Sequence, residues 1–127
     1  MVGGFFGGNM KMNHFFYKEN CKQKKNRIIP ISSRFIGEDN NAIKWEIRPI
    51  TQMKNEEILK ACGFLQQTDA KKQYEELLLA EAVVFPNLHD MKLQDSYGVM
   101  GSQKLLTVML TPGEYEHLKE VVQELCK

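Results

Sequence analysis

The spacing of hydrophobic residues changes part of the way along this chain, and this change most constrains its fold. Apolar and charged residues alternate strictly at residues 43–48 (IKWEIR), which predicts a half-buried β-strand. From Ile58 onward, apolar residues recur every three or four positions, as on one face of a helix. The two periods in this order predict an α+β fold, with an N-terminal β-hairpin followed by a mainly α-helical bundle of four to five helices.

The hairpin requires a second strand and a turn before residue 43. Residues 28–36 are rich in β-branched and aromatic side chains, and residues 37–41 (GEDNN) have the glycine and asparagine that tolerate positive φ. Pro30 has no backbone N–H, so we expect this first strand to lie at an edge of the sheet.

Two helices are predicted next. Ile58, Ala61, Cys62 and Leu65 share one face of the first, which Gly63 weakens or ends. Thr68 or Asp69 can cap the second, which is expected to run to about Phe85 because Pro86 follows. The apolar stripe expected on the second helix comprises Tyr74, Leu77, Leu78, Ala82 and Phe85.

The C-terminal part predicts three further helices. A short one is expected at residues 90–96, and Ser102 can cap another that runs through Leu110. The last has a capping box, with Thr111 as N-cap, Pro112 in first position and Glu114 in third. Its buried side is expected to comprise Tyr115, Leu118, Val122 and Leu125.

Charge divides the chain of 127 residues into two unequal parts. Residues 1–27 have six basic residues and one acidic residue, a net charge of +5, whereas residues 28–127 have 11 basic and 15 acidic residues, a net charge of −4. We therefore predict a flexible, basic, Gly/aromatic-rich arm (1–27) and a single domain (28–127). The arm either orders on a partner or is a frayed terminus. A further hypothesis is that translation begins at Met10 or Met12.

Signatures of enzymes and metal sites are missing from the sequence. It contains no GxGxxG, GxxxxGK[ST], HExxH or GxSxG motif, and its three cysteines and three histidines are scattered. The GxxG at residues 98–101 favours helix C-capping and close packing at its glycines. Asp90 and Asp95 are expected to cap helix ends, and His89 to be a surface or cap residue. We therefore expect no catalytic, cofactor-binding or metal-binding residues, and free thiols in a reducing compartment.

Nucleic acid and membranes are not expected partners. The basic residues between 18 and 27 lie near aromatics that could stack on bases, but the acidic body would repel phosphate. No apolar run approaches the roughly 18 residues that a membrane span needs, and no secretory signal is visible at the N-terminus. A cytoplasmic location is the expectation.

Three blocks resemble one protein family, the XkdN-type tail assembly chaperones of phages and phage-derived contractile tails. They are WEIRPI at residues 45–50, VVFPNLHDMKLQDSYGVMG at 83–101 and LLTVMLTPGEYEHL at 105–118. The resemblance covers roughly residues 28–127. Residues 63–72 look short against the family's usual middle, and the first dozen residues have no counterpart there.

The resemblance implies a chaperone that acts in the host bacterial cytoplasm. Such a protein binds the tape measure protein, keeps it soluble, helps tail tube subunits polymerise around it, and is absent from the finished particle. The alternative is a structural adaptor, or minor component, that remains in the tail. A homo-oligomer and a longer, frameshifted form are both compatible with the sequence.

The candidate partner-binding residues lie on the alternating strand, in residues 86–101 and on the last helix. We expect a groove formed by residues 86–101 and the last helix, which could cover an apolar stripe of a helical partner. Trp45 is either core or contact, Arg48 either binds an acidic partner or lies along the hairpin, and the methionines either fill the core or form an adaptable surface. The candidate residues are Trp45, Arg48, Pro86, Leu88, Met91, Tyr97, Met100 and Tyr115.

Overall fold

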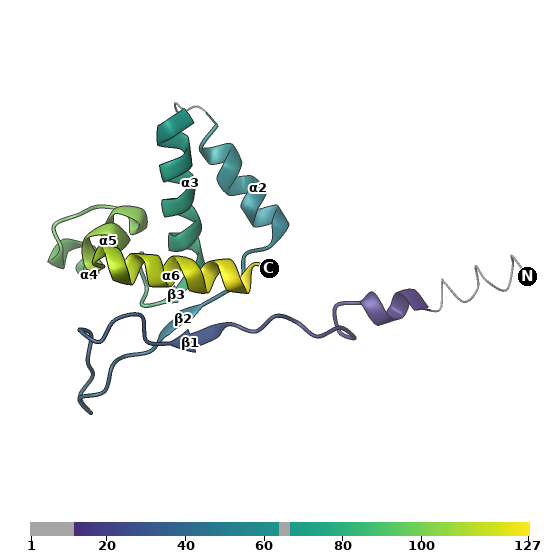
Figure 1. Ribbon diagram of the computed structural model, residues 1–127, viewed down its shortest axis with the longest axis horizontal. Coiled ribbons are helices and arrows are strands. Elements are labelled where there is room, and N and C mark those ends of the chain that lie inside the picture. The colour runs from purple at the N-terminus through teal and green to yellow at the C-terminus, as the bar shows by residue number, and fades with distance from the viewer. Residues whose placement is uncertain (1–11, 64–66) are drawn as a thin grey trace, which may run out of the picture.

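The computed structural model describes residues 12–63 and 67–127. It has an α+β fold, in which a small antiparallel sheet packs against helices, as predicted (Figure 1). The described part of the arm includes a short 3-10 helix, η1 (Asn13–Phe16), and runs away from the helices in Figure 1. Met10, one of the two proposed start sites, lies outside the described residues.

The sheet contains the predicted hairpin and one strand that was not predicted. Strand β1 (Arg27–Ile29) pairs with β2 (Trp45–Ile47), and β2 pairs on its other side with β3 (Val83–Phe85). The first strand is shorter than the predicted 28–36, because Pro30 cannot donate a hydrogen bond to the ladder. Ile31 and Ser32 then turn inward and are buried. The turn at 37–41 is confirmed: the Gly37 amide donates to the Asn41 carbonyl at 3.0 Å, and Asn40 has φ of 62°.

Helices α2 (Gln52–Ala61) and α3 (Gln67–Ala82) form the pair at the top of Figure 1. Thr51 caps α2 by accepting from the Lys54 amide, so this helix starts earlier than its apolar spacing predicted. Cys62 is its C-cap, and Leu65 lies outside the described residues. Helix α3 starts at Gln67, so neither Thr68 nor Asp69 is its N-cap.

The prediction that α3 continues to about Phe85 was wrong. The helix ends at Ala82, and Val83–Phe85 is strand β3. Two valines and a phenylalanine before a proline favour an extended backbone, and β2 offers them a pairing partner. The most buried side chains of α3 are Leu79, Ala80 and Ala82 rather than the whole predicted stripe, because α3 packs against α2, α5 and α6 together.

The three C-terminal helices are α4 (Met91–Ser96), α5 (Ser102–Met109) and α6 (Pro112–Leu125). Asp90 caps α4, and the capping box of α6 is present as predicted. The N-cap of α5 is Gly101 rather than Ser102, since Gly101 has φ of +94° and Ser102 is already helical. Gly98, with φ of +67°, follows the C-cap of α4, which confirms the predicted C-capping. The predicted close packing was wrong, since a Cβ added at Gly98 or Gly101 meets no atom within 4 Å.

One hydrophobic core joins the sheet to the helices. Trp45 and Ile47 point from β2 into it, so Trp45 belongs to the core, which was one of its two expected roles. Leu118 and Val122 are fully buried on α6, while Tyr115 and Leu125 pack partly buried against the same core. The core consists of Ile31, Trp45, Ile47, Leu79, Ala80, Ala82, Val83, Leu88, Leu105, Leu106, Met109, Leu110, Leu118, Val121 and Val122.

Candidate functional site

An apolar pocket of about 180 Å³ opens between the hairpin and residues 85–97. The hairpin, β3, α4 and the end of α5 all contribute to it, so it exists only in the folded domain. Its lining residues are Phe35, Ile43, Trp45, Phe85, Pro86, Leu93, Tyr97 and Met109. We name it the hairpin pocket.

The hairpin pocket has a buried floor and an exposed rim. Trp45 is 1% exposed and Met109 5%, whereas Phe85 is 50%, Tyr97 38% and Ile43 37% exposed. A cavity of about 150 Å³ can hold a benzene ring, so the hairpin pocket has room for one apolar side chain. Its exposed rim extends the apolar contact that such a partner could make.

Helix α4 and its caps fix one wall of the hairpin pocket. Tyr97 is the C-cap of α4, and the amides of Gly98 and Val99 donate to the carbonyls of Asp95 and Gln94. This is the Schellman arrangement, which needs the positive φ of Gly98. The Gln94 side chain also donates to the Leu88 carbonyl at 2.9 Å and accepts from the Gly101 amide at 3.0 Å. These bonds hold α4 between its flanking loops.

An ionic network holds another part of the lining of the hairpin pocket. Arg34 donates from Nε to Oε2 of Glu114 at 3.0 Å, and from Nη2 to Oε1 of Glu114 and to the Met109 carbonyl. The Ser32 hydroxyl also donates to Glu114. The Arg34 guanidinium, the Ser32 hydroxyl and the Thr111 amide hold the pKa of Glu114 well below its usual range. Because Arg34 precedes Phe35 and binds Met109, the network fixes two lining residues.

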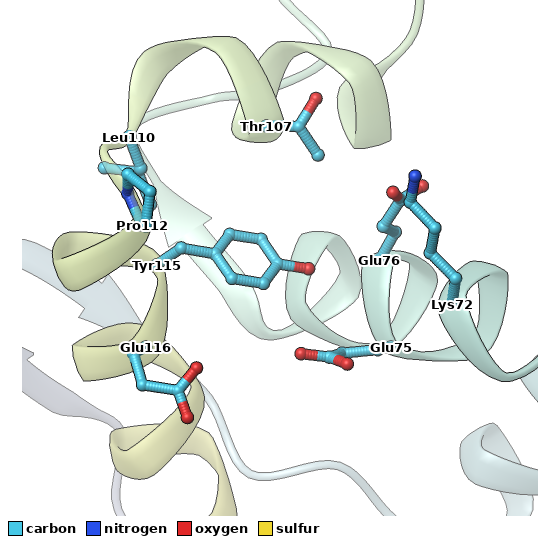
Figure 2. A pocket seen from close by; sticks show the side chains of 8 residues that line it. All are labelled: Lys72, Glu75, Glu76, Thr107, Leu110, Pro112, Tyr115 and Glu116. Atoms are coloured by element: carbon cyan, nitrogen blue, oxygen red, sulfur yellow. The ribbon is translucent and has the colours of Figure 1, made fainter.

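A second pocket, of about 410 Å³, lies among α3, α5 and α6 (Figure 2). The Tyr115 ring points across it toward Glu75 and Glu76 on α3. Leu110 and Pro112 form its apolar side, and Glu116 lies below Tyr115 in the view. Burial, and then the charges of Glu75, Glu76 and Glu116, raise the pKa of Tyr115 to about 12. We name this second pocket the tyrosine pocket.

The structure places only some predicted partner-binding residues together. Trp45, Pro86 and Tyr97 line the hairpin pocket, while Tyr115 of the last helix lines the tyrosine pocket instead. The predicted groove of residues 86–101 with the last helix is therefore divided: Pro86, Leu93 and Tyr97 line the hairpin pocket, and α6 lines the tyrosine pocket with α3.

The other four predicted residues lie elsewhere. Leu88 is 2% exposed and belongs to the core, so it presents almost no surface to a partner. Arg48 donates to the Glu81 carbonyl at 2.8 Å and pairs with the Glu81 carboxylate, so its acidic partner lies on α3 of the same chain. Met91 and Met100 are 73% and 89% exposed and line neither the hairpin pocket nor the tyrosine pocket. Met100 lines another, more polar pocket of about 480 Å³ at the start of α5.

Five lining residues of the hairpin pocket were not predicted as partner contacts. Phe35, Ile43 and Phe85 belong to segments read as regular strand or helix, in which apolar residues were expected to be buried. The signal that could have placed Phe85 is the run of Val83, Val84 and Phe85 before a proline, which is typical of a strand. Leu93 carries no local signal, because only tertiary packing brings it to the hairpin. Met109 is one of the methionines expected either to fill the core or to form an adaptable surface, and it belongs to the core while also lining this pocket.

Within residues 12–63 and 67–127, no group of three or more His, Cys, Asp or Glu side chains could hold a metal ion. Among the helices of the same residues, none is both long and apolar enough to cross a membrane. All three cysteines are free, with Cys62 buried.

The chain folds into a small α+β domain with pockets on its surface. Residues 12–127 match the family model described as phage XkdN-like tail assembly chaperone protein. The chain therefore belongs to the XkdN-like tail assembly chaperone family, as the resemblance of the three blocks predicted. The match also includes residues 12–27 of the arm and leaves out the first eleven residues.

A solved structure has the same fold. The crystal structure of the protein YqbN, a structural genomics target, aligns with a TM-score of 0.76 over 87% of this chain and 92% of that one. The two sequences are 20% identical, so this likeness supports the architecture alone. None of the curated proteins compared with the chain matches it.

Proposed function

We propose that this protein binds the phage tape measure protein through the hairpin pocket, without catalysing a reaction. It keeps the tape measure soluble in the host cytoplasm until tail tube subunits polymerise around it. Membership of a tail assembly chaperone family supports an interaction with tail components. The observation that carries the choice of site is the hairpin pocket itself, with its buried apolar floor and exposed apolar rim.

The physical argument rests on the chemistry of a long helical partner. A tape measure protein that is not yet enclosed would expose apolar stripes, and each stripe presents side chains at intervals of three and four residues. One such side chain can enter the hairpin pocket while its neighbours contact Phe85 and Tyr97. The small size of the pocket favours a weak individual contact, which tube subunits can later displace.

Many weak contacts along one tape measure would still retain the chaperone. Copies bound side by side on a long chain raise the effective concentration at each site, so the assembly persists although each copy exchanges. Growth of the tube from one end would then release the copies one after another. This sequence of events accounts for the proposed absence of the protein from the finished particle.

The test is co-expression with the tape measure protein encoded in the same phage genome, followed by affinity purification and a solubility assay. The informative variants are Phe85→Ser and Tyr97→Ser, which change exposed rim residues. Leu59→Ser on α2 is the matched control, since Leu59 is 50% exposed, like Phe85, and lies outside both pockets. Circular dichroism would verify that all three variants fold.

Soluble tape measure that co-purifies with the wild type and with Leu59→Ser, but aggregates with the rim variants, is the expected result. Equal recovery with all variants would remove the hairpin pocket from the proposal. Mass spectrometry of purified particles tests the remaining part. A fixed number of copies in every particle would instead favour the structural adaptor.

A further inference from the structure

The arm presents a cluster of aromatic side chains to solvent. Phe16 is 80% exposed, Phe15 60% and Tyr17 54%, and all three lie on or directly after the 3-10 helix η1. The segment runs away from the domain in Figure 1. Aromatic surface of this kind is costly to leave in water, so a contact that covers it would be favoured.

The charge around these aromatics is positive. Lys18 follows Tyr17 directly, and residues 1–27 as a whole carry a net charge of +5. Residues 28–127 carry a net charge of −4. A surface that fits the arm should therefore combine an aromatic or apolar recess with nearby carboxylates, and it should lie on the domain.

The tyrosine pocket has this combination (Figure 2). Tyr115, Leu110 and Pro112 supply aromatic and apolar surface, and Glu75, Glu76 and Glu116 surround it. Lys72 also lines the pocket, and Lys119 pairs with Glu75 at 3.3 Å and with Glu116 at 3.9 Å. Two lysines therefore offset the three carboxylates only in part. Burial is the main cause of the raised pKa of Tyr115, and the charges of Glu75, Glu76 and Glu116 add to it.

We propose that the tyrosine pocket receives the aromatic segment of the arm from a second copy of this chain. A ring of residues 15–17 stacks against Tyr115 and Pro112, and Lys18 lies among the carboxylates of Glu76 and Glu116. The contact makes the protein a homo-oligomer through its arms. It uses a different pocket from the proposed tape measure site, so both partners can bind at once.

The position of the arm favours docking onto a second copy over docking within the same chain. Lys24 donates to the Leu125 carbonyl at 3.0 Å, which fastens the base of the arm beside the C-terminal end of α6. The tyrosine pocket contacts the other end of this helix, at Pro112, Tyr115 and Glu116. From its base the arm continues away from the domain (Figure 1).

The test is sedimentation velocity of the full chain at low and high salt, with three variants. Phe15→Ser combined with Phe16→Ser changes the arm, and Glu116→Lys changes the pocket. Glu124→Lys is the matched control, because Glu124 and Glu116 lie on α6, are 60% and 61% exposed, and each pairs with a lysine three residues later. The arm and pocket variants should each weaken self-association about tenfold or more, the cost of about 1.4 kcal/mol, whereas the control should not.

A mixture of the two variants distinguishes docking between two copies from docking within one chain. The arm variant retains its pocket and the pocket variant retains its arm, so a mixture of the two should associate more tightly than either alone. A monomeric wild type would overturn the proposal, as would self-association that neither variant weakens. Loss of tape measure recovery in Glu116→Lys with unchanged self-association would assign the pocket to the tape measure and also overturn it. Rim variants of the hairpin pocket should leave self-association unchanged.

Discussion

Arg34 and Glu114 lie 80 positions apart in the chain and form a bidentate ion pair between the hairpin and the start of α6. Glu114 is also the third residue of the capping box, so one carboxylate both starts the last helix and holds the hairpin. Arg34 in turn binds the Met109 carbonyl, just before that helix. The shape of the hairpin pocket therefore depends on this pair, because Phe35 and Met109 both line it.

The first prediction concerns the coupling between these two residues. Arg34→Gln, Glu114→Gln and the double variant form a double-mutant cycle on the free energy of unfolding in urea. We expect the two single changes together to cost clearly more than the double change, because the pair is bidentate and Glu114 has further donors. Glutamine at position 114 can still serve the capping box, so the cycle isolates the ion pair.

A control cycle on Lys54 and Glu57 sets the scale for that coupling. These residues form an exposed pair at i and i+3 on α2, with 2.9 Å between Nζ and Oε2. Exposed helix pairs of this kind contribute little. A coupling at Arg34 and Glu114 no larger than the control's would contradict the structural role given to the pair.

The second prediction is the pH dependence that Glu114 introduces. Its pKa is lower in the folded state than in the unfolded chain, where a glutamate titrates near about 4.3. Its contribution to stability is therefore fully present above the unfolded pKa and is lost as the pH falls toward the lower folded pKa. The free-energy difference between wild type and Glu114→Gln should shrink from about pH 7 to about pH 3, which urea titrations at each pH would measure. A constant difference would exclude the low folded pKa.

The sequence predicted well those helices whose first residues are set by neighbouring capping side chains. Thr111, Pro112 and Glu114 specify the start of α6 within four residues, and Asp90 does the same for α4. The third strand could not be predicted with the same ease, because Val83–Phe85 gains its conformation from pairing with β2, 36 or more positions earlier. The α5 cap was misplaced by one residue, since Gly101 caps through its backbone conformation without a side-chain bond.

The candidate site was less accessible to prediction than the fold. Pro86 and Tyr97 were predicted from the family blocks, and Trp45 was predicted from the alternating strand. All three line the hairpin pocket. The remaining members depend on how the hairpin loop sits on α5, which the Arg34 pair determines over a long separation. Amphipathic spacing along single helices carries no information on such contacts.

The third prediction tests the capping box of α6. Thr111→Ala removes the hydroxyl that accepts from the Glu114 amide, so one amide of the first turn loses its partner. We expect a loss of about 1 kcal/mol in the free energy of unfolding. Thr107→Ala is the control, since Thr107 is exposed within α5 and alanine is a better helix former. Equal effects of the two changes in urea denaturation would contradict the cap.

The fourth prediction concerns Gly98 and Gly113, where substitution by alanine should change the free energy of unfolding in opposite directions. A Cβ added at Gly98 or at Gly113 meets no atom within 4 Å, so neither change causes a clash. Gly98 has φ of +67°, and the left-handed conformation should make Gly98→Ala destabilising by about 1 kcal/mol. Gly113 lies in the first turn of α6, where alanine restricts the unfolded chain and should add about 0.5 kcal/mol. Thermal unfolding of both variants measures the two signs. A stabilising Gly98→Ala would mean that α4 does not end in the Schellman arrangement, and that Tyr97 is not held at the rim of the hairpin pocket as described.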